Sequence, residues 1–171
     1  KQAAEAVREA VTPLVGTVRA GHLVSVKAEG DLTTKVDAVA EEAAIKVLEE
    51  SGMSFTLISE ELGKKKFGKE NAGTIVLDPL DGSTNAIRGI PAYSVSMAYS
   101  KGNRLSEVCE ALVVDLANGE VFESKLHEGA KRNRSPIFSS KTVQRLSESM
   151  IGIDLNLVDL RIYLKKIMGI L

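Results

Sequence analysis

The segment 78–83 reads Asp-Pro-Leu-Asp-Gly-Ser, so a proline and a leucine separate two carboxylates. An apolar run leads into this segment and predicts a buried strand over 74–78. We expect the strand to stop at Pro79, which lacks an N–H group and fixes its own φ, and the chain then to turn tightly. Gly82 lets the backbone approach a ligand closely. Two acids beside a turn with N–H groups predict a place where hard cations and a phosphate oxygen bind together.

Two further carboxylates stand at the boundaries of other predicted elements. Glu60 follows a short apolar run, and Asp37 opens a helical pattern. Each feature also has an ordinary structural explanation, because Asp-Gly turns are common and an acid in the first turn complements the helix dipole. Acids at the ends of three separate elements are nevertheless hard to explain as solvated surface. We therefore interpret them, together with Asp78 and Asp81, as parts of one site.

The chemistry that this set suits is phosphoryl transfer assisted by metal ions. Glu60, Asp78 and Asp81 offer hard oxygen ligands, which Mg²⁺ prefers and shares with substrate phosphate. Two such ions clamp the attacking and leaving oxygens of an in-line displacement. In that arrangement Asp78 bridges the ions, and the Leu80 carbonyl in the same turn supplies a further oxygen.

The residues after the second acid suit the phosphate and the attacking water. The N–H groups of Gly82 and Ser83 would face the phosphate, particularly if a helical turn begins there. The Ser83 hydroxyl, linked to Asp37, would orient the water and pass on its proton.

This arrangement resembles the inositol monophosphatase family, a lithium-sensitive, Mg²⁺-dependent superfamily of sugar phosphatases that also contains fructose-1,6-bisphosphatases. The matching motifs are Asp-Leu-Thr-Thr-Lys-Val-Asp at 31–37, Ser-Glu-Glu at 59–61 and Asp-Pro-Leu-Asp-Gly-Ser-Thr-Asn at 78–85. The run at 88–96 also looks like the family's. The resemblance covers essentially the whole chain and is strongest to archaeal members, several of which act on both inositol monophosphate and fructose 1,6-bisphosphate.

The resemblance implies a role for each residue at a matching position. The metal ligands would be Glu60, Asp78, the Leu80 carbonyl and Asp81. The catalytic groups would be Glu60 and the water-activating pair Asp37 and Ser83. The groups that bind the substrate phosphate would be Asp81, Gly82 and Ser83. Residues 27–31 would form a mobile loop over the site.

The resemblance also sets expectations for the whole protein. It implies two or three Mg²⁺ ions, a small phosphorylated polyol or sugar as substrate, a cytoplasmic location and a homodimer of the full-length protein. Two departures qualify it: Ser83 stands where threonine is usual, and the family's second α/β domain is missing. That domain carries a Trp-Asp-x-Ala-Ala-Gly motif, and this sequence has no Trp. We therefore expect 1–171 to be the N-terminal metal- and phosphate-binding domain, with weak or no activity alone.

Composition excludes several other classes of protein. The 171 residues are 44% apolar with a formal net charge of −1, so neither a polybasic nucleic-acid binder nor a disordered acidic chain is expected. One cysteine, Cys109, rules out an internal disulfide, and two histidines make a zinc site improbable. No apolar run reaches the length of a membrane span.

The predicted fold is α+β, with N-terminal helices packed on a largely antiparallel sheet; the resemblance makes this the first half of an αβαβα fold. Helical spacing predicts helices over 3–19, interrupted at Pro13, and from Thr34 to about Ser51, the latter with a Thr34–Asp37 capping signal. Strands are expected over 54–59, 92–100, 107–114 and 120–124, with an Asn-Gly hairpin before the last. We further expect a helix over 139–147, a strand over 150–155 and a helix over 157–171.

Three segments are expected to be loops: 22–31, 62–73 and 127–134. The second contains Lys64-Lys65-Lys66 and Lys69, which we interpret as a solvated loop tip. The alternative is an electropositive lip that attracts a phosphorylated substrate.

Other functions remain open at this point. Related phosphatases that cleave 3'-phosphoadenosine 5'-phosphate or NADP would use the same motif. A phosphatase of the haloacid-dehalogenase type is disfavoured, because its two aspartates flank a single residue whereas two residues separate Asp78 from Asp81. A catalytically inactive regulatory or assembly module would keep the fold without the chemistry.

Overall fold

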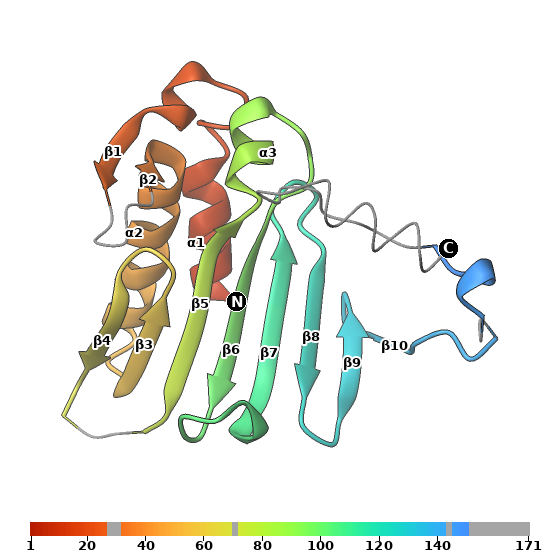
Figure 1. Cartoon of the computed structure of the whole chain (residues 1–171). Coiled ribbons are helices and arrows are strands. Elements are labelled where there is room, and N and C mark those ends of the chain that lie inside the picture. Colours follow the sequence, from red (N-terminus) through yellow and green to blue (C-terminus); the bar gives the residue numbers. More distant parts are fainter. Residues whose placement is uncertain (27–31, 70–71, 143–144, 151–171) are drawn as a thin grey trace, which may run out of the picture. The chain divides into compact units, whose positions relative to one another are not determined.

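The protein is seen in a computed structural model that describes residues 1–26, 32–69, 72–142 and 145–150. The chain divides into two units, Lys1–Ile137 and Phe138–Leu171. The first unit holds a large sheet with two helices packed against it (Figure 1). The fold is therefore α+β, as predicted. None of the helices within the described ranges could span a membrane.

The helices of the first unit are α1 (Gln2–Val11), α2 (Lys35–Glu50) and α3 (Ser83–Arg88), with short 3-10 helices η1 (Val18–Gly21) and η2 (Leu105–Glu107). Its strands are β1 (Leu23–Val26), β2 (Leu32–Thr34), β3 (Phe55–Ser59), β4 (Gly63–Phe67), β5 (Thr74–Asp81), β6 (Ser94–Ser100), β7 (Val108–Asp115), β8 (Val121–Lys125), β9 (Gly129–Arg132) and β10 (Ser135–Ile137). The described part of the second unit contains a 3-10 helix, η3 (Leu146–Glu148).

The large sheet has eight strands in the order β10-β9-β8-β7-β6-β5-β3-β4, and β1 pairs separately with β2. Every neighbouring pair is antiparallel except β3 and β5, which run parallel. Parallel strands end at the same edge of a sheet. The residues that follow β3 and those at the end of β5 therefore meet, although the connection through β4 separates them in sequence.

The core lies between the helices and one face of this sheet. Val7 and Val11 of α1 are buried, and Leu57, Leu77 and Val95 are buried on the strands. The apolar stripe of α2 contributes Val36, Ala40, Ala44 and Leu48. Burying a valine or leucine side chain stabilises a fold by roughly 1.5–3 kcal/mol. The helical spacing in the sequence thus identified the faces that hold the helices on the sheet.

The predicted interruption of the first helix and the predicted start of the second are confirmed. Helix α1 ends at Val11, just before Pro13, which cannot continue a helix. The part of the first helix predicted after Pro13 is wrong, because the chain there forms turns and then η1. Helix α2 begins after Thr34, whose side chain and backbone N–H form a capping box with Asp37. Gly52 then takes a φ of +67°, the left-handed conformation common after a helix.

Two of the segments predicted as loops contain strands. Leu23–Val26 is β1, and residues 27–31 lie outside the described residues. Gly63–Phe67 is β4, so Lys64, Lys65 and Lys66 lie on an edge strand rather than at a loop tip, whereas Lys69 lies in a bend after the strand. Lys65 Nζ lies 4.8 Å from the centre of the Phe67 ring and 3.3 Å from Glu49 Oε1. A strand bonded on one side only can be polar at almost every position, so its composition is that of a loop.

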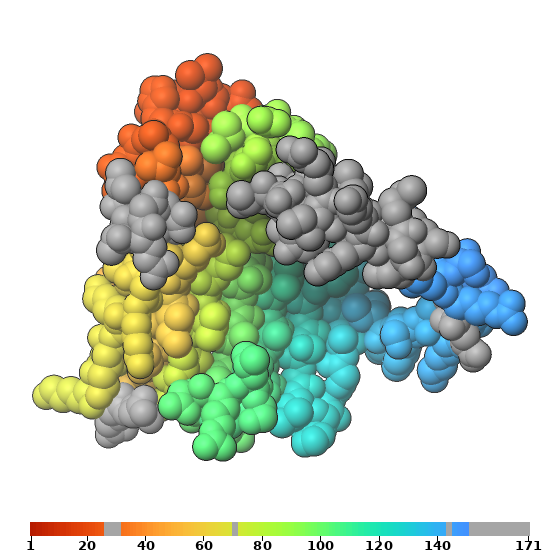
Figure 2. Space-filling view, viewed as in Figure 1, coloured from red at the N-terminus to blue at the C-terminus, as the bar shows by residue number. Residues whose placement is uncertain are grey.

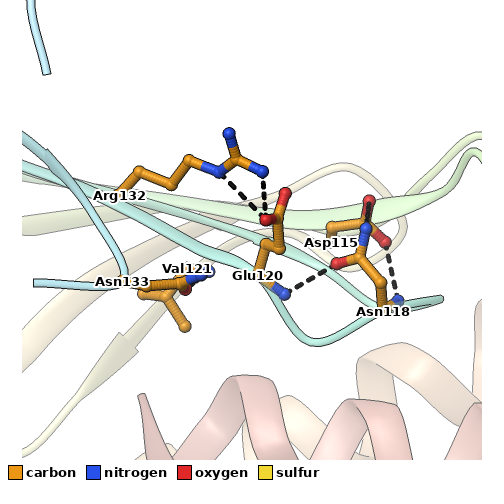
Figure 3. Close-up of polar contacts among 6 residues, drawn as sticks. All are labelled: Asp115, Asn118, Glu120, Val121, Arg132 and Asn133. Atoms are coloured by element: carbon orange, nitrogen blue, oxygen red, sulfur yellow. Dashed lines mark hydrogen bonds and ion pairs between the residues drawn. The ribbon is translucent and has the colours of Figure 1, made fainter. Parts of the chain in front are cut away.

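The third predicted loop forms the hairpin β9–β10, shown in part in Figure 3. Asn133 and Arg134 both have positive φ, +49° and +71°, which gives a two-residue turn of the kind that matches strand twist. The Asn133 side-chain oxygen accepts a hydrogen bond from the Val121 N–H at 2.9 Å, and Arg132 pairs with Glu120, the residue before the neighbouring strand β8. The Asn118-Gly119 hairpin before β8 is as predicted.

The end of the chain was predicted less well. Of the expected helix over 139–147, only the 3-10 turn η3 exists among the described residues. Met150 is not in a strand, and the rest of the predicted strand over 150–155 lies beyond the described ranges, as does the predicted helix over 157–171.

Candidate functional site

The parallel pairing of β3 with β5 brings Glu60 beside Asp78. Ser59 is in register with Leu77, and the Glu60 N–H donates to the Leu77 carbonyl at 3.3 Å. The next residue on each strand is an acid, and the two carboxyl groups form a hydrogen bond. Residues 18 positions apart thus form one acidic pair, as expected from the sequence.

Asp78 lies close to all the other predicted acids. Burial raises the pKa of Asp78 above its ordinary value, and the charges of Asp81 and Asp37 raise it further. Hydrogen bonds from the Leu80 N–H, at 3.1 Å, and from Glu60 act in the opposite direction and lower this pKa. The net effect is a raised pKa, so the charged form of Asp78 destabilises the folded chain. Carboxylates from three elements therefore share one electrostatic environment.

The bend after Asp78 differs from the prediction at Pro79. Strand β5 continues to Asp81, with an irregularity in its pairing with β6 between the two aspartates. A proline is tolerated in a strand at such a bulge because no ladder hydrogen bond is needed there. Pro79 and Leu80 are buried, whereas Asp81 is exposed. The bulge therefore places the second aspartate at the surface, where a ligand can reach it.

Gly82 is the residue that allows the chain to turn into α3. Its φ is +89°, and a Cβ atom at this position would lie 2.7 Å from the Ala92 carbonyl oxygen. No side chain fits that space without movement of the backbone. Helix α3 begins at the next residue and is held by a hydrogen bond from the Gly16 N–H to the Ala86 carbonyl at 2.9 Å. In Figures 1 and 2 the α3 segment lies against the N-terminal segment around η1.

The predicted hydrogen bond between Asp37 and Ser83 is not formed between these two described residues. Asp37 is 7% exposed, and its Oδ2 atom accepts from the Thr34 hydroxyl at 2.5 Å and the Thr34 N–H at 3.2 Å. The Ser83 hydroxyl donates instead to the Leu80 carbonyl at 3.3 Å. Each group has thus found a partner in its own segment, because a capping box and a tight turn satisfy polar groups locally.

Sequence reasoning missed the residues that hold the segment around Glu60 through hydrogen bonds. Glu41 Oε1 accepts from the Ser59 hydroxyl at 2.5 Å and from the Leu62 N–H at 2.8 Å. Thr33 donates to Glu61 at 2.5 Å. The available signal was the spacing of Glu41, four residues after Asp37 and so on the same face of the helix.

The site residues offer the donors that a hard cation requires. Glu60 and Asp81 are exposed, and Glu60 and Asp78 border a shallow hollow over β3, β5, β6 and β7. Within the described ranges, however, no three His, Cys, Asp or Glu side chains converge closely enough to enclose an ion. Burial and the charges of Asp81 and Asp37 raise the pKa of Asp78, and a bound cation would oppose that rise. The donor set fits Mg²⁺ in its chemistry, with a backbone carbonyl and waters completing the shell.

The sequence is similar to those of known phosphatases. The sequence model of the inositol monophosphatase family matches residues 1–157. The fructose-1,6-bisphosphatase/inositol-1-monophosphatase of Methanothermobacter thermautotrophicus is 40% identical over 158 residues, which cover 87% of this chain and 56% of that protein. The bifunctional NADP phosphatase/NAD kinase of Methanococcus maripaludis is 30% identical over 167 residues, covering 88% of this chain and 29% of that protein.

A solved structure shows the same fold. A protein of Pyrococcus horikoshii with similarities to inositol-1 monophosphatase superposes with a TM-score of 0.68 and 27% identity, over 84% of this chain and 53% of that one. The chain spans about half the length of these relatives, or less.

Proposed function

Since the chain belongs to the inositol monophosphatase family, we propose that it carries the metal- and phosphate-binding half of a phosphatase. The reaction is hydrolysis of a phosphate monoester of a small polyol or sugar. The observation that supports this most directly is the hydrogen-bonded pair Glu60 and Asp78, with Asp37 and Asp81 close enough to raise the pKa of Asp78. A structural role would not need acids from three elements within electrostatic reach of one another, because like charges destabilise each other.

The residues that would hold Mg²⁺ are Glu60, Asp78, the Leu80 carbonyl and Asp81. When bound, two or three such ions supply positive charge for the phosphate and for the attacking oxygen. The upward shift of the Asp78 pKa agrees with this role, because a cation would offset the repulsion from Asp81 and Asp37. Asp81 is exposed at the end of the bulge, so it would also contact the substrate.

The turn that follows would hold the substrate phosphate. The first N–H groups of a helix have no partner inside the helix and attract anions. Gly82 and Ser83 bring such groups next to Asp81, and the absence of a Cβ atom at Gly82 lets the turn pack closely against the Ala92 carbonyl.

Asp37 and Ser83 would orient the attacking water and accept its proton. Ser83 donates to the Leu80 carbonyl over 3.3 Å, a long hydrogen bond that can be exchanged for one to water at little cost. Thr34 fixes the Asp37 carboxylate through two hydrogen bonds, so this acid keeps a constant direction while the hydroxyl moves. Serine serves here as threonine would, with more rotamer freedom.

The substrate class has two candidates. The curated relatives favour a phosphorylated polyol or sugar, such as inositol monophosphate or fructose 1,6-bisphosphate. The NADP phosphatase among the relatives favours a nucleotide with a phosphate monoester on its ribose as the alternative. This class comprises NADP and 3'-phosphoadenosine 5'-phosphate.

Phosphate release from a panel of substrates tests the proposal. The full-length protein that contains this chain is assayed in Mg²⁺ with inositol monophosphates, fructose 1,6-bisphosphate, phosphoadenosine phosphate and NADP, beside the chain of 171 residues alone. We expect hydrolysis by the former, little by the latter, and a loss of at least about 100-fold in Glu60→Gln and Asp78→Asn. The exposed acid Glu42 on α2 provides the control Glu42→Gln, which should keep full activity. Absence of hydrolysis by the full-length protein with every substrate would overturn the proposal.

A further inference from the structure

Glu41 of α2 holds the turn that presents Glu60. Its Oε1 atom accepts one hydrogen bond from the Ser59 hydroxyl at 2.5 Å and another from the Leu62 N–H at 2.8 Å. These two donors lie on either side of Glu60, at the end of β3 and in the turn that leads to β4. A single carboxylate oxygen therefore closes a ring around the segment that carries the acid.

One of the two donors is buried and the other lies at the surface. Ser59 is 5% exposed, whereas Leu62 is 41% exposed. Beside them, Thr33 donates to Glu61 at 2.5 Å and is 5% exposed. Hydrogen bonds to a carboxylate are stronger than those between neutral groups, and the low dielectric around the Ser59 hydroxyl strengthens its bond further. Glu60 thus projects to the surface from a turn whose neighbouring residues on both sides are tied to other elements.

The place of Glu41 along α2 connects this ring to Asp37. Residues four apart lie on one face of a helix, one turn from each other. Asp37 is itself fixed at the start of the same helix by its capping box with Thr34. One helix face therefore sets the position of the proposed water-activating acid and, through Glu41, the position of the proposed metal ligand Glu60.

We propose that Glu41 is a positioning residue for the metal site: its carboxylate fixes the turn 59–62 so that Glu60 meets Asp78 and binds the metal with it. This inference rests on the proposed function, because it assigns Glu41 a role in metal binding. Supporting partners of metal ligands commonly change affinity by 10–100-fold when removed.

A purely structural role for Glu41 would be to tie α2 to the hairpin β3–β4. The chain offers a matched control for that role, because Glu49 of the same helix binds Lys65 of the same hairpin at 3.3 Å. Lys65 is in register with Leu57, in the middle of β3 and away from the turn that carries Glu60. Removing Glu49 therefore loosens the same two elements without affecting the ring.

The experiment compares wild type with Glu41→Ala, Glu41→Gln and Glu49→Ala, all in the complete chain. Amide hydrogen exchange at Leu62 is measured without metal, and the affinity for Mg²⁺ by calorimetry, at a temperature where circular dichroism shows every variant folded. We expect Glu41→Ala to speed exchange at Leu62 at least about tenfold and to weaken Mg²⁺ binding about tenfold. Glu41→Gln keeps an acceptor oxygen in the same place and should restore most of both, while Glu49→Ala changes neither.

Several results would overturn the inference, and they can be told apart from failure of the proposed function. If wild type binds Mg²⁺ and Glu41→Ala binds it equally tightly, the positioning role alone is overturned. The same holds if Glu49→Ala weakens Mg²⁺ binding as much as Glu41→Ala does. A wild type that binds no Mg²⁺ overturns the proposed metal site together with this inference. If Glu41→Ala does not fold, Ser59→Ala replaces it, because this variant removes one of the two hydrogen bonds to Glu41. A Mg²⁺ affinity of Ser59→Ala equal to that of wild type would then overturn the positioning role.

Discussion

The carboxyl groups of Glu60 and Asp78 form a hydrogen bond with each other, across two parallel strands. Burial and the charges of Asp81 and Asp37 raise the pKa of Asp78, whereas a bound cation would favour its charged form. Metal binding, protonation and stability are consequently linked at this pair.

Magnesium should stabilise the folded chain through this pair. A ligand present at 100 times its dissociation constant adds about 2.7 kcal/mol to the free energy of unfolding. We expect the melting temperature to rise with Mg²⁺ concentration in wild type and to fall back when EDTA is added, as measured by calorimetry. Asp78→Asn should lose most of this rise, whereas the control Glu42→Gln should keep it. Equal rises in all three proteins would show that the ion binds elsewhere.

The stability of the metal-free chain should depend on pH through Asp78. The pKa of this residue is higher in the folded state than its ordinary value, so the folded state binds the proton more tightly. Asp78 therefore costs no stability below its unfolded pKa. The cost grows as pH rises through the folded pKa and is complete above it.

Asp78→Asn removes that cost, and this gives a measurable difference in EDTA. We expect urea unfolding to show the variant more stable than wild type at pH 7, with the difference shrinking as the pH is lowered towards 4. A variant that is less stable than wild type at pH 7 would mean that burial and the neighbouring charges do not raise the pKa of Asp78 in the chain.

Thr34→Ala should destabilise the chain and release Asp37. The substitution removes the 2.5 Å hydrogen bond from the Thr34 hydroxyl, and loss of an N-cap side chain costs about 1 kcal/mol. Thr34→Ser keeps the hydroxyl and should recover most of that loss in denaturant unfolding. If serine and alanine behaved alike, the cap would contribute nothing to stability.

Gly82→Ala should cost more than a substitution at another glycine with positive φ. Alanine in this conformation carries a penalty of about 1–3 kcal/mol wherever it occurs. At Gly82 the new Cβ would also meet the Ala92 carbonyl oxygen at 2.7 Å, whereas at Gly52, with φ +67°, nothing lies within 4 Å. We expect Gly82→Ala to be the less stable of the two in urea unfolding, and to bind phosphate more weakly. Equal stabilities would show that the turn relaxes around the methyl group.

Local chemistry was sufficient to predict some elements from the sequence. Thr34 and Asp37 form a cap through atoms three residues apart, and Gly119 takes the positive φ of +80° that closes the hairpin between β7 and β8. The acids at the ends of three predicted elements were also expected to form one site, because they are hard to explain as solvated surface. The parallel pairing of β3 with β5, which brings Glu60 beside Asp78, was not predicted. The cap and the hairpin depend on neighbours in sequence.

Other features depend on partners that the sequence does not show. The lysines of β4 form a strand only because β3 offers it a free edge, and the strand β5 passes through Pro79 only because a bulge removes the need for an N–H. The contacts of Glu41 with Ser59 and Leu62 span a helix and a turn. The helical spacing places Glu41 on the same face as Asp37, but it does not indicate these two partners. Tertiary pairing decided each of these cases.

The two borders of the large sheet are β4 and β10, and each discourages lateral growth. A strand from another molecule would meet the ammonium groups of Lys64, Lys65 and Lys66 at one border, and at the other Pro136, which has no N–H to offer. Stacking of sheets edge to edge into fibres is therefore opposed at both ends. Replacing these lysines by neutral residues would increase self-association of the molecule without altering its core.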